Sequence, residues 1–363
     1  MFRAELEKIV SYEAGKPIEL VARDYGVAAS DVVKLASNEN PFGASEKVRA
    51  KLAAIVNQTH RYPDDSYFAL KAAIANKYNM NSKNIIIGSG SDQIFEFISH
   101  VILERGDIVL QNKIDFAMYA IYTAQAGGET LRAESEIHDL NEFEKLLAKD
   151  PKIIYLCTPA NPLGNAMDRD EIYKFLPKVN QNSLVVIDAA YMEFAAYKDA
   201  KKHIEPRDVT EKFPNVIYTG TFSKAYGLGG MRVGYGIANE KIIKELHKMR
   251  APFNITTLSL AAAIEAIGDQ EFVQKTITHN FAEMEKYEKF ARDRKIKYIE
   301  SYTNFITFFF DRQNEASEIA QKLLKNGMIV RDLKSYGLNA IRVTIGLEAE
   351  NAKFMKLFDE ARR

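Results

Sequence analysis

The sequence has little cysteine, no excess of either charge and no long hydrophobic run. Its one cysteine, Cys157, excludes a disulfide within the chain and fits a reducing compartment. Lysine and arginine together number 49, as do aspartate and glutamate, so the formal net charge is zero. The chain therefore lacks the positive charge that nucleic-acid binding requires.

No segment approaches the roughly 18 apolar residues that a membrane-spanning helix needs. The first residues mix charges into their apolar positions, which is not typical of a signal peptide. The six histidines are never four positions apart and never flank a second cysteine, so no metal site is predicted. We expect a cytoplasmic globular protein.

With 363 residues, the chain is long enough for two domains. Apolar runs alternate with helical patterns through its first two thirds, which predicts an α/β domain with a mostly parallel sheet and helices on both faces. A long helical stretch is predicted over 256–292, and an α+β pattern follows it. We predict an N-terminal arm of two short helices (1–30), a large domain (49–269) and a small domain (31–48 with 270–363). The expected strands cover residues 84–87, 107–111, 129–134, 152–157, 183–188, 215–219, 296–300, 304–310, 327–331 and 340–345.

One lysine stands in an unusual stretch, YTGTFSKAYGLGGMRVGY, at 218–235. Lys224 has hydroxyl neighbours there, follows a predicted strand and precedes Arg232 by eight positions. A lysine amine can form a Schiff base with a carbonyl cofactor, while Ser223 and Arg232 can hold a phosphate. The alternative is a surface lysine in a flexible loop.

Three more polar turns follow apolar strands. Residues 88–93, GSGSDQ, end a strand and begin a helix, an arrangement that points backbone N–H groups at an anion. Asn161 follows a second strand, and Asp188 ends a third. Because ligands of open α/β sheets bind beyond the carboxyl ends of the strands, we expect Asn161, Asp188 and Lys224 to meet. Asp188 would then pair with a protonated heterocyclic nitrogen; the alternative is that it caps the next helix.

Together these motifs resemble the pyridoxal-phosphate-dependent aminotransferases of the aspartate-aminotransferase fold (fold type I). Within that superfamily the chain is similar to the histidinol-phosphate aminotransferases. The matching segments span nearly the whole chain: LASNENPFG (35–43), RYPD (61–64), GSGSDQ (88–93), DFAMY (115–119), CTPANPLG (157–164), VVIDAAY (185–191), TFSKAYGLGGMRVGY (221–235), IVRD (329–332) and IRVTIG (341–346).

The resemblance implies a transamination of L-histidinol phosphate with 2-oxoglutarate, in histidine biosynthesis, by a ping-pong mechanism. Lys224 would form the internal aldimine and shuttle the proton, and Asp188 would pair with the pyridinium nitrogen. Asn161 and Tyr191 would hydrogen-bond the cofactor's 3′ oxygen, and Phe116 would stack on its ring. The phosphate would be held by the backbone N–H groups of Gly90, Ser91 and Asp92, and by Ser223 and Arg232.

Further residues are implied at the edges of the site. Tyr62 resembles the family tyrosine that reaches the neighbouring subunit's cofactor phosphate, which implies a homodimer with shared active sites. Arg331 and Arg342 resemble the arginines that hold the anionic end of the substrate. Asn38 is expected to contact the substrate, and Tyr25 to hold its imidazole.

The chain departs from the family pattern at two places. Ala160 and Leu163 stand in a turn that more commonly has two asparagines and a threonine, and Ala189 follows Asp188 where glutamate is usual. Each departure leaves the cofactor-contacting residue in place, so it affects the substrate assignment more than the cofactor assignment. An aromatic amino acid aminotransferase on the same fold is the main alternative. A decarboxylase of a phosphorylated amino acid is another, and a transcription regulator is disfavoured because residues 1–30 are too short and too evenly charged for a DNA-binding extension.

Overall fold

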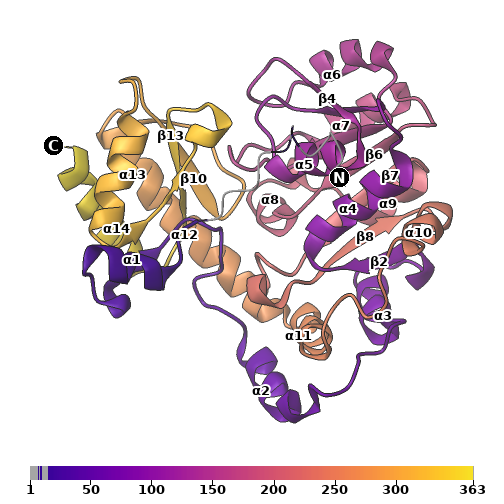
Figure 1. Ribbon diagram of the computed structural model, residues 1–363, viewed down its shortest axis with the longest axis horizontal. Helices are drawn as coiled ribbons and strands as arrows, with labels where there is room; N and C mark the ends of the chain where they lie inside the picture. The colour runs from indigo at the N-terminus through magenta and orange to yellow at the C-terminus, as the bar shows by residue number, and fades with distance from the viewer. Residues whose placement is uncertain (1–6, 8, 10–14, 363) are drawn as a thin grey trace.

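The structure, a computed structural model, describes residues 7, 9 and 15–362. Its largest sheet has seven strands in the order β2-β8-β7-β6-β5-β3-β4 (Figure 1). The strands are β2 (Ile85–Gly88), β3 (Ile108–Gln111), β4 (Glu129–Arg132), β5 (Ile153–Cys157), β6 (Leu184–Asp188), β7 (Val216–Thr221) and β8 (Gly234–Ala238). All six strands that the sequence predicts between residues 84 and 219 are present, with small differences at their ends.

The sheet is mostly parallel, as predicted. Strands β4, β3, β5, β6 and β7 run parallel to one another, and β8 pairs antiparallel with both β7 and β2. Strand β8 was not predicted, because its sequence GYGIA has two glycines and lacks an apolar alternation. Gly234 has a local reason: a Cβ there would lie 2.2 Å from the backbone nitrogen of Ser91, so only glycine lets β8 approach the turn after β2 this closely.

Helices cover both faces of this sheet, and the alternation of side chains along β5 shows the two layers. Ile153 and Tyr155 pack in one buried cluster with α4, α5 and α10, whereas Ile154 and Leu156 pack in another with α7, α8, α9 and α11. The helices of this part are α2 (Glu46–Ile55), α3 (Phe68–Lys77), α4 (Gly90–Ile102), α5 (Ala117–Ala126), α6 (Leu140–Leu146), α7 (Arg169–Phe175), α8 (Met192–Lys198), α9 (Pro206–Lys212), α10 (Glu240–His247) and α11 (Thr257–Gly268).

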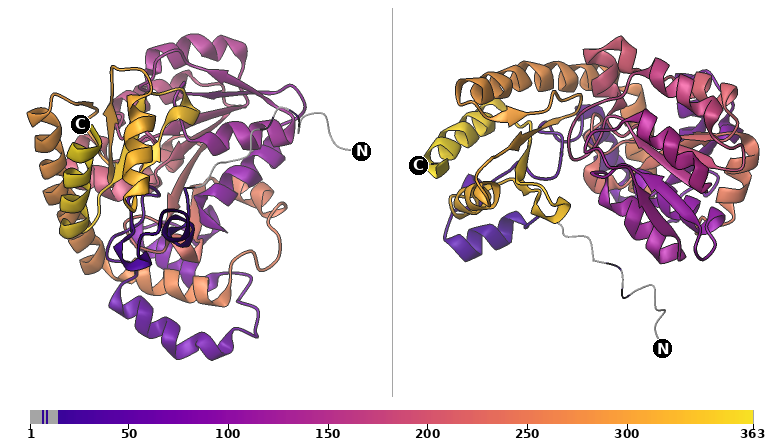
Figure 2. Two further views of the ribbon diagram at one scale, coloured as in Figure 1. Left: turned by 60° about the vertical axis from the view of Figure 1, so that its left-hand side comes forward. Right: turned by 90° about the horizontal axis from the view of Figure 1, so that it is seen from above.

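A smaller α+β part lies beside the large sheet and combines the beginning and the end of the described chain (Figures 1 and 2). Its four-stranded sheet has the order β12-β13-β10-β9, and β1 pairs with β11 in a separate parallel pair. Its elements are α1 (Ile18–Tyr25), β1 (Val33–Lys34), α12 (Gln270–Asp293), β9 (Lys297–Tyr298), β10 (Phe305–Phe309), α13 (Glu315–Lys325), β11 (Met328–Ile329), β12 (Arg331–Asp332), β13 (Ala340–Thr344) and α14 (Glu348–Arg362).

The helical stretch predicted over 256–292 is two helices rather than one. Helix α11 ends at Gly268, and α12 begins at Gln270 after Asp269, whose φ and ψ of −96° and 66° are not helical. Glycine and aspartate are both unfavourable inside helices, which explains the break. The buried Asp269 forms an ion pair with Lys47 of α2, with Nζ and Oδ1 3.0 Å apart. This contact links the break between the two helices to α2.

In the arm, the second predicted helix is present as α1 and ends at Gly26, whose φ of 69° is left-handed. The first predicted helix lies outside the described residues. The predicted domain boundaries at 49 and 270 stay predictions. In the part of the chain that the structure describes, no helix is long and apolar enough to cross a membrane.

Candidate active site

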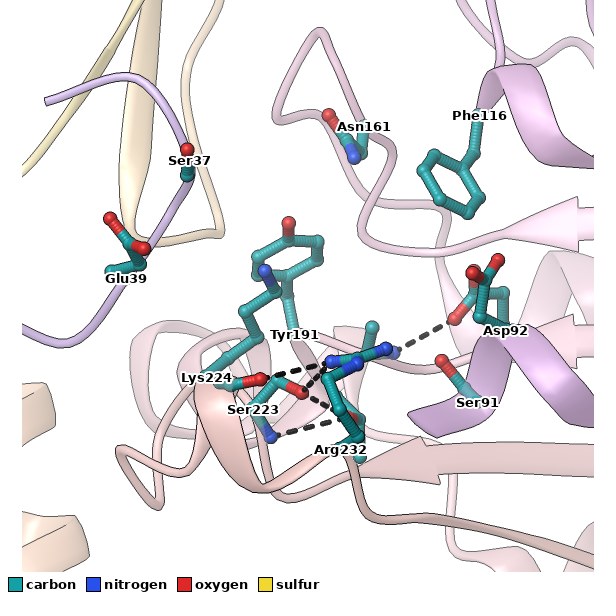
Figure 3. Close-up of a pocket in the computed structure, with 14 residues that line it drawn as sticks. Ser37, Glu39, Ser91, Asp92, Phe116, Asn161, Tyr191, Ser223, Lys224 and Arg232 are labelled. Atoms are coloured by element: carbon teal, nitrogen blue, oxygen red, sulfur yellow. Dashed lines mark hydrogen bonds between the residues drawn. The ribbon is translucent and has the colours of Figure 1, made fainter. Parts of the chain in front are cut away.

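The candidate site is a cavity beyond the carboxyl ends of β5, β6 and β7 (Figure 3). Because these strands are parallel and adjacent, Asn161, Asp188 and Lys224 come together at one edge of the sheet, as the sequence predicts. The residues that line the cavity are Ser37, Glu39, Ser91, Asp92, Phe116, Asn161, Asp188, Ala190, Tyr191, Thr221, Ser223, Lys224, Gly229 and Arg232.

Lys224 lies in the turn that follows β7, with its side chain only partly exposed. Burial, together with the positive charges of Arg342 and Arg232, lowers the pKa of Lys224 to about 8. The side chain amide of Asn40 donates to the carbonyls of Lys224 (3.4 Å) and Ala225 (3.1 Å), which fixes the turn. Near neutral pH more of this lysine is therefore the neutral amine, the form that attacks a carbonyl, than of an ordinary lysine, although the charged form still predominates.

Asp188 is 4% exposed at the end of β6. Burial raises the pKa of this carboxyl to about 6, although its hydrogen bonds from the Tyr119 hydroxyl (2.5 Å) and the Ala190 N–H (3.1 Å) favour the charged form. The helix-cap alternative is not what the structure shows, since the N-cap of α8 is Tyr191 and no side chain caps it. A buried acid that faces a cavity is suited to a cationic ring nitrogen, whose charge would offset the cost of burial.

The residues predicted to form the phosphate cup come together where α4 begins. Gly90 has a φ of 77°, and a Cβ at this position would lie 2.5 Å from Nη2 of Arg232, so glycine leaves the space that the arginine occupies. Nη1 of Arg232 donates to the hydroxyl of Ser223 (3.3 Å) and to the carbonyl of Gly229 (3.1 Å). A guanidinium, a hydroxyl and the N-terminus of the 13-residue helix α4 thus converge, which is the donor set that a phosphate needs.

Asp92 lies in this cup. It lines the cavity, and its Oδ1 is buried with no hydrogen-bond partner among the described residues. Burial raises the pKa of this carboxyl, while the nearby Arg232 opposes the shift. We expect Asp92 to use its backbone N–H toward a phosphate, because its carboxylate would repel that anion.

Phe116, Asn161 and Tyr191 line the upper part of the cavity (Figure 3). The Tyr191 hydroxyl accepts a hydrogen bond from Nδ2 of Asn38 at 2.8 Å, and burial raises the pKa of that hydroxyl. Asn38 is buried with a left-handed φ of 55° and does not line the cavity, whereas its partner Tyr191 does. Its predicted contact with the substrate stays a prediction.

The two predicted anion-binding arginines lie side by side in the small sheet. Arg331 of β12 pairs in register with Arg342 of β13. Arg342 is 7% exposed and donates from Nη1 to Oδ1 of Asn161 (2.5 Å) and from Nη2 to the carbonyl of Ala36 (2.7 Å). The small sheet therefore reaches the cavity through a direct contact between Arg342 and a cavity residue.

Six predicted residues are not among those that line the cavity: Gly90, Asn38, Arg331 and Arg342, described above, and Tyr62 and Tyr25. Tyr62 is 80% exposed and stacks on Phe253 with ring centroids 4.6 Å apart. The Tyr25 hydroxyl accepts a hydrogen bond from Nε2 of Gln321 at 3.3 Å, and the Lys16 ammonium lies over its ring. Their roles in binding stay predictions.

Several residues of the site were not predicted. Ser37 and Glu39, which line the cavity, flank the predicted Asn38 within one motif. Tyr119, which does not line the cavity but donates to Asp188, ends the motif that contains Phe116. These residues could have been predicted from the sequence, because they lie within motifs that already contain predicted site residues. The contact of Tyr119 with Asp188 joins residues 69 positions apart, which no local pattern shows.

The described residues fit pyridoxal phosphate. The arrangement combines an amine of lowered pKa, a buried carboxyl, a ring for stacking and a cup whose glycine makes room for an arginine. Lys224, Asp188, Phe116 and the cup around Arg232 would hold the cofactor's aldehyde, ring nitrogen, ring face and phosphate respectively.

Comparisons with known proteins show the family to which the chain belongs. The model of the family "Aminotransferase class I and II" matches residues 30–356. The chain is 55% identical over 357 residues to a histidinol-phosphate aminotransferase of Sulfurimonas denitrificans, covering 98% of each chain. It is also 55% identical over 360 residues to one of Aliarcobacter butzleri, covering 99% of this chain and 98% of that one.

Two solved structures show the same fold. The histidinol-phosphate aminotransferase of Sinorhizobium meliloti, in complex with pyridoxal-5′-phosphate, superposes with a TM-score of 0.91 at 24% identity, covering 100% of this chain and 97% of the other. A double mutant of Thermus thermophilus aspartate aminotransferase superposes with a TM-score of 0.84 at 18% identity, covering 99% of each chain. From the family match and the relatives at 55% identity, the chain belongs to the class I and II aminotransferases, enzymes that depend on pyridoxal phosphate.

Proposed function

We propose that the protein transfers the amino group of L-histidinol phosphate to 2-oxoglutarate, forming imidazole-acetol phosphate and L-glutamate. Full-length relatives of 55% identity that carry the name histidinol-phosphate aminotransferase support the first substrate. The observation that carries the proposal is the pair of arginines beside the cavity, Arg331 and Arg342, of which Arg342 contacts Asn161. The single cysteine, Cys157, is buried, which suits the cytoplasmic location that we also propose.

When bound, pyridoxal phosphate supplies the carbonyl that receives the amino group and the ring that delocalises the electrons of the substrate carbon. Asp188 keeps the ring nitrogen protonated, and Tyr119 and the Ala190 N–H hold that carboxylate in place. Asn161 and Tyr191 would hydrogen-bond the ring oxygen, and Phe116 would cover the ring face; all three line the cavity.

Lys224 would have two tasks in this proposal: its amine would hold the cofactor's aldehyde by a condensation that releases water, and it would then carry a proton between two carbons. Both tasks require an amine that gains and loses a proton near neutral pH, and the pKa of about 8 supplies this. Asn40 holds the carbonyls of the turn, so the amine can move while its backbone stays fixed.

A ping-pong aminotransferase must bind two different amines in one pocket. Histidinol phosphate has no α-carboxylate, so a phosphate is its strong anchor, whereas glutamate has carboxylates and no phosphate. Guanidinium groups bind both anions through paired hydrogen bonds and keep their charge at any working pH. We infer that Arg342 and Arg331 contact whichever anion is present.

Replacing Arg342 with lysine should lower kcat/KM for both histidinol phosphate and glutamate by about 10- to 100-fold, because an ammonium cannot reproduce the paired hydrogen bonds of the guanidinium. Single-turnover kinetics of each half-reaction would measure this. Arg312→Lys, an exposed arginine of the small part, is the matched control and should leave both rates unchanged. A normal rate for either substrate in the Arg342 variant would contradict a shared anion site.

We also propose a homodimer in which Tyr62 reaches the partner subunit's phosphate cup. Large apolar side chains are exposed in two segments, residues 56–68 and 249–253. Arg250 of the second segment donates two hydrogen bonds of 2.8 Å to the carboxylate of Asp65 in the first. These side chains, here the apolar patch, are Val56, Tyr62, Phe68, Met249 and Phe253. Tyr62 and Phe253 of this set stack on each other, and exposed apolar side chains that gather in this way are typical of a protein interface.

Phe253→Glu should therefore convert a dimer, of twice the 41.1 kDa of one chain, into monomers, because it places a charge within the apolar patch. Sedimentation equilibrium would measure the mass. Tyr197→Glu, at an exposed aromatic of α8, is the control and should remain dimeric. A monomeric wild-type protein would contradict the proposal.

A further inference from the structure

One exposed acidic side chain, Glu39, lines the cavity. Figure 3 shows Ser37 and Glu39 on one side of Lys224, and Ser91, Asp92 and Arg232 on the other. Since the second group forms the phosphate cup, the first group lies where a substrate amine approaches Lys224. Glu39 is thus a substrate-side residue rather than a cofactor-side residue.

The backbone that carries Glu39 is fixed on both sides. The N–H of Asn38 donates to the Thr344 hydroxyl at 2.9 Å, and its side chain donates to the Tyr191 hydroxyl. Asn40 donates to the Ala225 carbonyl at 3.1 Å, in the turn of Lys224. An exposed side chain on so constrained a backbone is presented in one place relative to the reacting lysine, which is the condition for a specificity contact.

The Glu39 carboxylate has one ion-pair partner and can accept further hydrogen bonds. Lys34 donates to its Oε1 at 2.9 Å, with the two side chains 25% and 53% exposed. Exposed ion pairs of this kind are weak, and a carboxylate has about four acceptor positions, so it can accept a further hydrogen bond. The other acids that line the cavity, Asp92 and Asp188, are more buried and belong to the cofactor side.

Resting on the proposed function, we propose that Glu39 accepts a hydrogen bond from the imidazole N–H of histidinol phosphate and so selects this substrate. The substrate has an anion at one end and an N–H donor at the other. The site offers Arg342, which is hydrogen-bonded to the cavity residue Asn161, and Glu39, which lines the cavity. Glutamate has no donor besides its amine, and its distal carboxylate gains nothing from Glu39. Glu39 therefore favours the binding of histidinol phosphate and does not favour the binding of glutamate.

The test is Glu39→Gln in the cofactor-loaded enzyme. For histidinol phosphate, kcat/KM should fall about tenfold, chiefly through KM, because the neutral amide is a weaker acceptor. For glutamate, kcat/KM should be unchanged or rise, because a like charge is removed. Lys34→Met, which frees the carboxylate of its partner, should maintain or increase the preference for histidinol phosphate. Glu46→Gln, an exposed glutamate of α2, is the matched control and should change neither value.

An equal fall for both substrates in Glu39→Gln would show a structural role and would overturn the proposal, as would no change for histidinol phosphate. A loss of that preference in Lys34→Met would overturn it independently. If the wild-type enzyme did not turn over histidinol phosphate, the proposed function would fail, and this inference with it. Failure of the inference alone leaves wild-type turnover intact, so the two are distinguishable.

Discussion

Replacing Lys224 with alanine should reduce kcat by at least about 10³-fold, because positioned proton transfer alone contributes about 10²–10⁴-fold and the variant also loses the covalent amine. The turn itself should survive, since the hydrogen bonds from Asn40 go to the backbone carbonyls of Lys224 and Ala225. The variant should therefore fold and retain the phosphate cup.

Borohydride reduction of the cofactor-loaded wild-type enzyme, followed by peptide mass spectrometry, should place the cofactor on Lys224. Lys244→Ala, at an exposed lysine of α10, is the control and should keep full activity and the same label. If the Lys224 variant turned over at the wild-type rate, or the label lay on another lysine, the assignment of the active site would be wrong.

Asp188→Asn should bind the cofactor yet lose roughly 10²- to 10³-fold in kcat. A neutral amide cannot keep the ring nitrogen protonated, and breaking a buried charge pair costs about 3–5 kcal/mol. Asparagine is close to aspartate in size and can still accept from the Tyr119 hydroxyl, so the change removes charge with little change of shape.

The stability of the cofactor-free protein separates this role from a structural one. Burial raises the pKa of Asp188 to about 6, above the unfolded value of 3.8. Its stabilising effect is therefore fully present only below about pH 4 and is lost as the pH rises through 6. At pH 8 the Asn variant, without a buried charge, should melt no lower than the wild type. A lower melting temperature with an unchanged rate per folded molecule would show a structural carboxylate.

The positions of the central site residues were predictable, because each follows an apolar strand. Parallel neighbouring strands end at one edge of a sheet, so Asn161, Asp188 and Lys224 must meet once the strands are assigned. The glycine turn before α4 was predictable for a similar reason, since strand, glycine and helix are local features.

Other features depend on contacts that no local pattern contains. Strand β8 is rich in glycine because Gly234 must approach the Ser91 nitrogen, and this removes the side chains that mark a strand. The bond of Arg342 to Asn161 joins residues 181 positions apart. Glu39 lies in a motif that the sequence predicts only as a polar turn. The position of its side chain depends on the hydrogen bonds of Asn38 and Asn40, which the sequence does not show.

The most direct test of the proposed function is a comparison of kcat/KM for histidinol phosphate, histidinol and phenylalanine on one preparation, with 2-oxoglutarate as the acceptor. Because the phosphate is the substrate's strong anchor, we expect histidinol phosphate to be far better than histidinol, by at least about 10²-fold. Phenylalanine should also be much poorer than histidinol phosphate. If phenylalanine equalled or exceeded histidinol phosphate, the enzyme would be an aromatic amino acid aminotransferase, and the phosphate-anchor account would be contradicted.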